Sequence, residues 1–292
     1  MAFEIPSHFA EQFTTNVELL LQESMPIMLM GANMQSYSGS KSAQVVKQFG
    51  EVEFETRTTR NADTNFAEIE HKQRWVFPTD FTLALPVDNE DELKMLNSPV
   101  SPYVAAMRAA WARKSNAICR DALLGSAKTG DNGGTTTAFD TSNQQIASGS
   151  AGLTITKLRS ALETLRANYA LDDPSVQLNF AVTAKQMTDL LETTEVTSTD
   201  YNTVKALVNG EINTFLGFNF LHYQSLGVDG ASARRCIAWT SDALAYGMWN
   251  SPTTNIGPRA DKNYLNQVHM AFTAGATRTQ EGKVVEVLCS ES

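Results

Sequence analysis

The residue types that most often bind metals or carry catalysis are few and scattered in this sequence. The four histidines, His8, His71, His222 and His269, occur singly, with neither an HExxH motif nor the cysteine and histidine spacing of a zinc site. His222 and His269 fall in predicted strands, where we expect them to be packing residues. The sequence therefore predicts no metal site.

Three short stretches come closest to known reactive motifs. GSAKTGDNGG, around Lys128, lacks the GxxxxGK[ST] of a phosphate-binding loop and follows a predicted helix instead of a strand. SGSAG, residues 148–152, lacks the first glycine of a GxSxG nucleophile elbow. The acidic run at residues 88–92 could attract a divalent cation, but its place before apolar residues favours a helix N-terminus. We predict no catalytic residue and no cofactor; a cytoplasmic α+β enzyme that uses the loop near Lys128 is the remote alternative.

Composition limits the class of protein further. A chain of 292 residues with 42% hydrophobic content can bury a real core in one large domain or two joined ones. A net charge of -9 disfavours sequence-specific DNA binding, because phosphates are contacted mainly by Lys and Arg. Cys119, Cys236 and Cys289 are far apart and odd in number, so we expect buried, reduced thiols. No stretch reaches the roughly 20 apolar residues of a membrane span, and no basic leader is present.

Residues 1–41 are predicted to form an N-terminal arm. Phe9, Phe13 and Val17 recur at helical spacing, which predicts an amphipathic helix that Pro26 ends. The apolar stripe of this helix needs a surface to pack on.

Residues 42–86 are predicted to form a long β-hairpin. Val52 and Phe54 alternate with glutamates, the period-two pattern of a half-buried strand. Its aromatic side chains are Phe49, Phe54, Phe66, Trp75, Phe77 and Phe81. An isolated two-stranded ribbon is marginal in water, so this one must pack either on its own domain or on another chain. Arg57 and Arg60, near the predicted tip, are either solvated or paired with acidic groups, and between chains such pairs would set register more than affinity.

The remainder predicts an α+β fold. Residues 98–125 indicate a long helix, with Ser98 or Ser101 as the N-cap and Gly125 as the end, and its Arg and Lys residues favour a solvated face. Residues 126–152 indicate a flexible surface loop. Helices then follow over residues 155–169, after Thr183 and near residues 204–210, with strands over 176–182, 215–226 and 234–240. Residues 268–289 indicate a closing strand pair.

This order of elements, from arm through hairpin, long helix and loop to an α+β region and closing strands, resembles the major capsid proteins of tailed bacteriophages, which have the Hong Kong 97-type shell fold. Three stretches carry the resemblance: VKALVNGEINTFLGFNFLHYQSL, RRCIAWTSDALAYGM and RADKNYLNQVHMAFTAGATRTQEGKVVEVLC. The family commonly shows a similar LGF step and a late GA-x-R before a valine-rich strand. An encapsulin-type compartment with the same fold is the alternative.

The resemblance implies a domain division. Residues 1–41 would be the arm, 42–86 the extended loop, 87–150 with 261–292 the peripheral domain and its spine helix, and 151–260 the axial domain. The closing strands would brace the spine helix and the base of the extended loop. The contacts between subunits would involve Phe9, Phe13, Phe54, Arg57, Arg60, Phe66, Trp75 and Phe77.

The resemblance also implies partners and a place of action. Copies of the chain would form hexamers and pentamers of an icosahedral virion shell, assembled in the bacterial cytoplasm. A separate scaffolding protein, a portal and in some cases a cement protein would take part. The shell would enclose double-stranded DNA without sequence-specific binding and without a membrane. No lysine or asparagine here matches the isopeptide cross-link of some such shells, so no cross-link is predicted.

Overall fold

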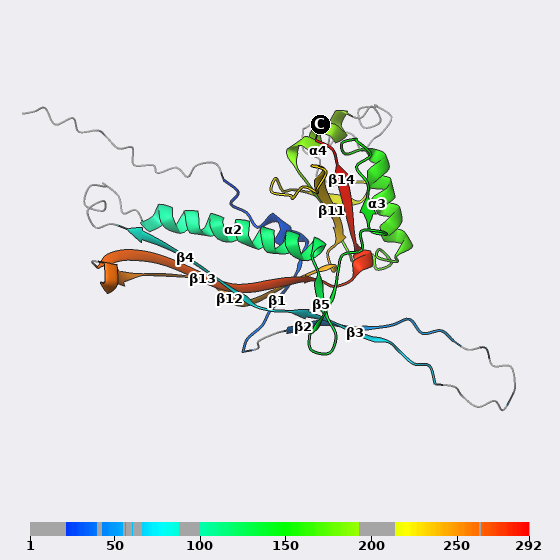
Figure 1. Cartoon of the computed structure of the whole chain (residues 1–292), viewed down its shortest axis with the longest axis horizontal. Coiled ribbons are helices and arrows are strands. Elements are labelled where there is room, and N and C mark those ends of the chain that lie inside the picture. Colours follow the sequence, from blue (N-terminus) through cyan, green and yellow to red (C-terminus); the bar gives the residue numbers. More distant parts are fainter. Residues whose placement is uncertain are drawn as a thin grey trace, which may run out of the picture.

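The computed structural model shows an elongated α+β molecule built on three β-sheets (Figure 1). It describes residues 22–39, 43–54, 56, 60, 66–87, 100–192, 214–262 and 264–291. The predicted α+β class is confirmed. The predicted helices at residues 9–21 and 204–210 and the acidic run at residues 88–92 lie outside the described residues.

A long four-stranded sheet packs beneath the longest helix. Its order is β1 (Asn33–Ser36), β12 (Leu244–Arg259), β13 (Leu265–Arg278) and β4 (Thr79–Val87). The helix α2 (Val100–Leu124) runs along this sheet (Figure 1) and ends just before Gly125, as predicted. Of the two predicted N-caps, Ser101 lies inside the helix and Ser98 lies outside the described residues. Met107 of α2 packs with Val268 and Met270 of β13 in a small apolar cluster. The alternating burial of β13 follows from having the helix on one face only.

The main core surrounds a second, six-stranded sheet. Its order is β7 (Gln145–Ile146), β14 (Val284–Cys289), β11 (Arg234–Thr240), β8 (Leu178–Val182), β10 (Phe218–His222) and β9 (Thr214–Phe215). The helices α3 (Ile155–Ala167) and α4 (Ala184–Glu192) add apolar residues to this core. Thr183 begins α4 as predicted, and its backbone N–H donates to the side chain of Gln186, as in a capping box. All three cysteines are buried and free, which confirms that prediction.

The third sheet includes the projecting hairpin. Its order is β2 (Ala43–Phe49), β3 (His71–Val76), β5 (Ala127–Thr129) and β6 (Thr135–Thr137). β5 and β6 form a tight hairpin with Gly130 and Gly133 at positive φ, so the prediction of a flexible loop over residues 126–152 is wrong for this part. Lys128 lies in β5 opposite Thr136, within a regular strand pair. The described residues also include the 3-10 helices η1 (Ile27–Gly31), η3 (Ala260–Lys262) and η4 (Glu281–Lys283).

The predicted hairpin over residues 42–86 is wrong in its second half. Among the described strands β2 pairs with β3 alone, whereas β4 leaves this sheet and pairs with β13 from Thr79↔Ala274 to Val87↔Asn266. The break falls at Phe77 and Pro78, where proline removes a backbone donor. The Phe77 carbonyl lies where a Cβ on Gly275 would be, so this crossing requires a glycine in β13.

The prediction that residues 268–289 form a closing strand pair is also wrong. β13 belongs to the long sheet, while β14 pairs with β11 and β7 in the six-stranded sheet. The reason lies in burial: every residue of β14 is buried, whereas β13 alternates. A strand buried on both faces needs cover on both sides, which the six-stranded sheet provides. The two strands therefore do not act as a pair: β13 packs on α2, whereas β14 lies in the main core. Among the described residues, no helix has the length and apolarity to cross a membrane.

Candidate assembly surfaces

The projecting hairpin presents apolar side chains to solvent. Its strand pairing ends at Phe49↔His71, and the N–H of Gly50 donates to the carbonyl of Glu70 at 2.7 Å. Beyond that point Phe54 is 104% and Phe66 is 95% exposed. Figure 1 shows the hairpin leaving the body in the direction opposite to the far ends of β12 and β13. An exposed phenylalanine on a thin ribbon gains nothing from its own fold, so these two side chains are available to a partner.

The structure separates the predicted contact residues into different groups. Phe54, Phe66 and Arg60 are exposed, and Phe77 is 41% exposed. Trp75 is half-buried, and its indole N–H donates to the Gly130 carbonyl at 2.6 Å, so it packs on its own sheet. Phe9, Phe13 and Arg57 lie outside the described residues. Contact of these side chains with a second copy stays a prediction.

Further apolar side chains on the hairpin were not among the predicted contact residues. They are Phe49, Val52 and Ile69, which are 65%, 48% and 42% exposed. The Phe49 ring meets the His71 ring edge-on across the strand pair, with centroids 5.0 Å apart. Alternation in the sequence signals both strands: Val52 and Phe54 alternate with glutamates, and Ile69 lies between Glu68 and Glu70.

The described part of the arm is tied to α2. Asn116 accepts from the N–H of Met28 at 2.9 Å and donates to the Met25 carbonyl at 2.9 Å. Arg113 donates to Gln22 at 2.6 Å. Met28 is fully buried, whereas Met30 is 74% exposed. Residues 22–31 are thus part of the protomer, although single methionines still point to solvent.

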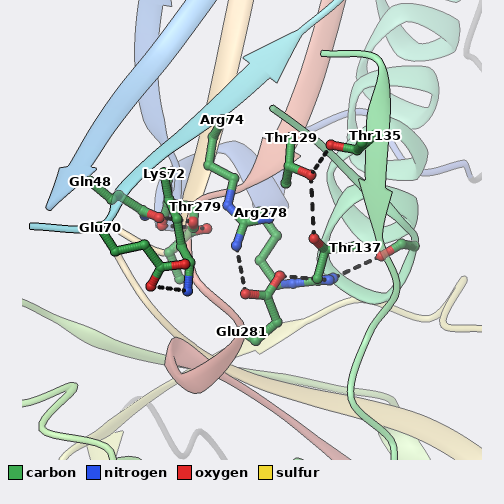
Figure 2. A network of polar contacts seen from close by, with 12 residues as sticks. Gln48, Glu70, Lys72, Arg74, Thr129, Thr135, Thr137, Arg278, Thr279 and Glu281 are labelled. Carbon is green, nitrogen blue, oxygen red and sulfur yellow. Dashed lines mark hydrogen bonds and ion pairs between the residues drawn. The ribbon is translucent and has the colours of Figure 1, made fainter. Parts of the chain in front are cut away.

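A buried ionic cluster holds the root of the hairpin (Figure 2). Arg74 of β3 donates to Glu281 of η4 at 2.6 Å. Arg278, at the end of β13, donates to the carbonyls of Leu123 and Gly125 at 2.7 and 2.9 Å. Burial lowers the pKa of Arg278, and the nearby Glu281 carboxylate opposes that shift. The cluster joins three elements that are far apart in sequence: the hairpin, the long sheet and the end of α2.

Sequence reasoning missed Arg74 and Glu281. The one available signal was Arg278, an arginine directly after an apolar strand in the GA-x-R motif. A buried arginine at such a place needs a carboxylate or carbonyl partner, but the sequence does not say which.

A second ionic pair closes the end of the chain on the six-stranded sheet. Arg234 donates to both carboxylate oxygens of Glu291, at 2.8 and 2.7 Å. These hydrogen bonds lower the pKa of Glu291 to about 2. Arg234 is therefore paired and not solvated.

The histidines and other potential metal ligands of the described residues do not come together in a site. No group of three or more His, Cys, Asp and Glu side chains within them could hold a metal ion. His71, His222 and His269 lie in three different strands. The prominent features are instead an apolar projecting hairpin and a long helix lying on a long sheet, which are typical of a structural protein.

The sequence comparison identifies the family. A family model described as Phage capsid protein matches residues 5–291, nearly the whole chain. The chain belongs to this phage capsid protein family. No match is found among curated proteins.

Solved structures show the same fold. The capsid of Ralstonia phage GP4 matches with a TM-score of 0.73 at 9% identity, covering 100% of this chain and 98% of that one. The capsid of the cyanophage P-SCSP1u matches with a TM-score of 0.71 at 13% identity, covering 98% and 94%. A Mycobacterium phage Che8 structure matches with a TM-score of 0.70 at 15% identity, covering 96% and 97%. The predicted shell fold is confirmed.

Family membership gives the role. The protein is a major capsid protein that forms the phage shell, and its place is the virion capsid. Such a role is structural, not enzymatic. Between the two shell types expected from the sequence, the family favours the phage capsid over the encapsulin-type compartment.

Proposed function

We propose that copies of this chain associate as hexamers and pentamers into an icosahedral shell around double-stranded DNA, without catalysis and without reading its sequence. The observation that carries this proposal is the near-complete exposure of Phe54 and Phe66 on a hairpin outside the body. Burying both rings on a neighbour would contribute a few kcal/mol per subunit. Because each subunit is held by several neighbours at once, such modest contacts give a durable wall.

We further propose a division of labour among the parts of the fold. The sheet β1-β12-β13-β4 and α2 form the peripheral domain, the six-stranded sheet forms the axial domain, and the β2–β3 hairpin is the extended loop. On this division β12 joins the peripheral part and β14 the axial part, unlike the division at residues 151–260 expected from the sequence. The residues expected at contacts are Phe9, Phe13, Phe54, Arg57, Arg60, Phe66 and Phe77.

The partners belong to the same proposal. A separately encoded scaffolding protein guides assembly in the host cytoplasm, a portal occupies one vertex, and a cement protein is an optional addition. The net charge of -9 supports the enclosure of DNA without tight binding, because an acidic wall repels the DNA packed inside it.

The test is a shortened hairpin. Residues 51–69 are replaced by Asn-Gly, which joins Gly50 to Glu70 where a backbone hydrogen bond already closes the ribbon. We expect a folded protomer, with its thermal unfolding midpoint nearly unchanged, that forms no closed particles by electron microscopy. The matched control keeps the hairpin length and replaces Glu51 and Glu53 with Gln, which should leave particles intact.

Two results would count against the proposal. Normal particles from the shortened chain would show that the hairpin is dispensable for assembly. Global unfolding of the shortened protomer would show instead that the hairpin packs on its own domain.

A further inference from the structure

An open cavity of about 460 Å³ lies at the root of the hairpin, between one face of the β2-β3-β5-β6 sheet and the η4 turn (Figure 2). Its walls come from segments that are distant in sequence. The residues that bear on the argument are Gln48, Lys72, Arg74, Thr129, Thr137 and Glu281. No role has so far been given to this space.

Two buried donors of Arg74, a residue that lines the cavity, have no acceptor. Arg74 is only 4% exposed and uses Nη2 on Glu281, while its Nε and Nη1 have no acceptor. Arg278 is fully buried behind it, and its Nε also has no acceptor. A buried guanidinium normally satisfies nearly all of its five N–H groups. Arg74 lines the cavity and Arg278 does not, so the Nε and Nη1 of Arg74 are the two nitrogens that indicate a missing acceptor there.

The buried side chains around Arg74 also carry more positive than negative charge. Arg74 and Arg278 carry two positive charges, and Glu281 is the one carboxylate that contacts them among the described residues. Lys72 at the rim is paired with Glu70 at 3.1 Å, and both are exposed. Asp131 lies at the exposed end of the turn between β5 and β6. Burial of an excess cation is costly unless an anion joins it.

The strands beside Arg74 in the same sheet add hydroxyl groups, because Thr129 lies directly opposite Arg74 in the β3–β5 pair. Thr129 Oγ1 lies 2.9 Å from Thr135 Oγ1 and 3.5 Å from Thr137 Oγ1. Each hydroxyl can donate as well as accept, so this row can turn protons toward an incoming anion. Guanidinium and hydroxyl donors around a small polar space are the usual surroundings of carboxylate and phosphate oxygens.

We propose that this cavity binds an oxyanion, with Arg74 as its principal ligand and the neighbouring threonine row as further donors. The anion has two sources. In the unassembled protomer it is inorganic phosphate. In the shell it is an Asp or Glu carboxylate of a second copy of this chain, a source that rests on the proposed assembly function. An acidic chain with 32 Asp and Glu residues supplies such a group readily.

The first arm of the test uses the unassembled protomer. A phosphate titration followed by ³¹P line broadening should saturate for the wild type, and saturating phosphate should raise the unfolding midpoint by about 3 °C over chloride of equal ionic strength. Arg74→Met should lose both effects. Arg74→Lys, which keeps the charge with fewer donors, should weaken binding and covers the case in which Arg74→Met does not fold. Arg108→Gln removes an exposed cation elsewhere and should leave both effects intact.

The second arm uses assembly in chloride buffer. If the source is the carboxylate of a second copy, Arg74→Lys should lower the yield of particles at least tenfold while Arg108→Gln assembles like the wild type. The proposal is overturned if phosphate shows no saturable binding and Arg74→Lys also assembles normally. Failure of the wild type to form particles contradicts the shell proposal alone, and the phosphate titration then decides the cavity by itself.

Discussion

The six-stranded sheet and the projecting hairpin use the same residue types in opposite ways. In the sheet, Phe180 is fully buried and its ring lies 5.4 and 5.6 Å from those of Phe218 and Phe220. On the hairpin, Phe54 and Phe66 are almost fully exposed. The sheet gains its stability within one chain. The aromatic side chains of the hairpin can be stabilised by burial only if they contact another molecule, so they form a surface that is available for assembly.

The comparison is tested most strongly in the core of the six-stranded sheet. Phe180→Ala should lower the free energy of unfolding by about 3–5 kcal/mol, because a large cavity is left in a packed interior. Chemical denaturation of the unassembled protomer measures this. A loss below about 1 kcal/mol would mean that this sheet is not the stabilising core.

A buried cation in the same unit should have the next largest effect. The Nζ of Lys157 donates to the carbonyls of Ala151, Gly152 and Leu288 at 2.7, 2.9 and 2.9 Å. Lys157→Met should lower the free energy of unfolding by about 2–3 kcal/mol, since three acceptors lose a charged donor. The control is Lys185→Met, which removes a half-exposed lysine from its i,i+4 pair with Asp189 and should cost under about 0.5 kcal/mol. Equal effects for the two lysines would contradict this.

A smaller effect is expected from pH. Because the pKa of Glu291 is lowered from 4.5 to about 2 in the folded protein, its pairing stabilises the fold above pH 4.5, and this contribution is lost as pH falls toward 2. The carboxylate is 26% exposed, so we expect only about 1 kcal/mol. Denaturation midpoints of the wild type and Glu291→Gln, measured between pH 7 and 2.5, should converge at low pH. A constant difference would contradict the role of this pair.

The smallest effect on protomer stability belongs to the hairpin. Phe54→Ala and Phe66→Ala should change the free energy of unfolding by less than about 0.5 kcal/mol, although each is the same chemical change as Phe180→Ala. The double variant should nevertheless reduce the yield of particles seen by electron microscopy. Strong destabilisation of the isolated protomer would mean that the two rings pack on their own chain.

Much of the local structure could be predicted from the sequence. Hydrophobic periodicity and the helix-ending glycine predict the helix Val100–Leu124 and its end before Gly125. Periodicity also predicts the strand Arg234–Thr240. The projecting hairpin was also predictable in part, because its alternating pattern sets aromatic residues on one face with no apolar partner nearby. Even the shell fold followed from the order of these elements and its resemblance to a known family.

Tertiary structure alone decided which strands pair. Residues 79–87 continue the β pattern of the hairpin but pair with β13, and β13 and β14 follow each other in sequence but join different sheets. Alternation shows which face of a strand is buried; it does not show the strand that lies beside it. The ion pair between Arg74 and Glu281 joins residues 207 positions apart, so it exists only because those sheets meet. Local periodicity is a property of a short segment, whereas backbone pairing and buried charge depend on what the rest of the chain places next to it.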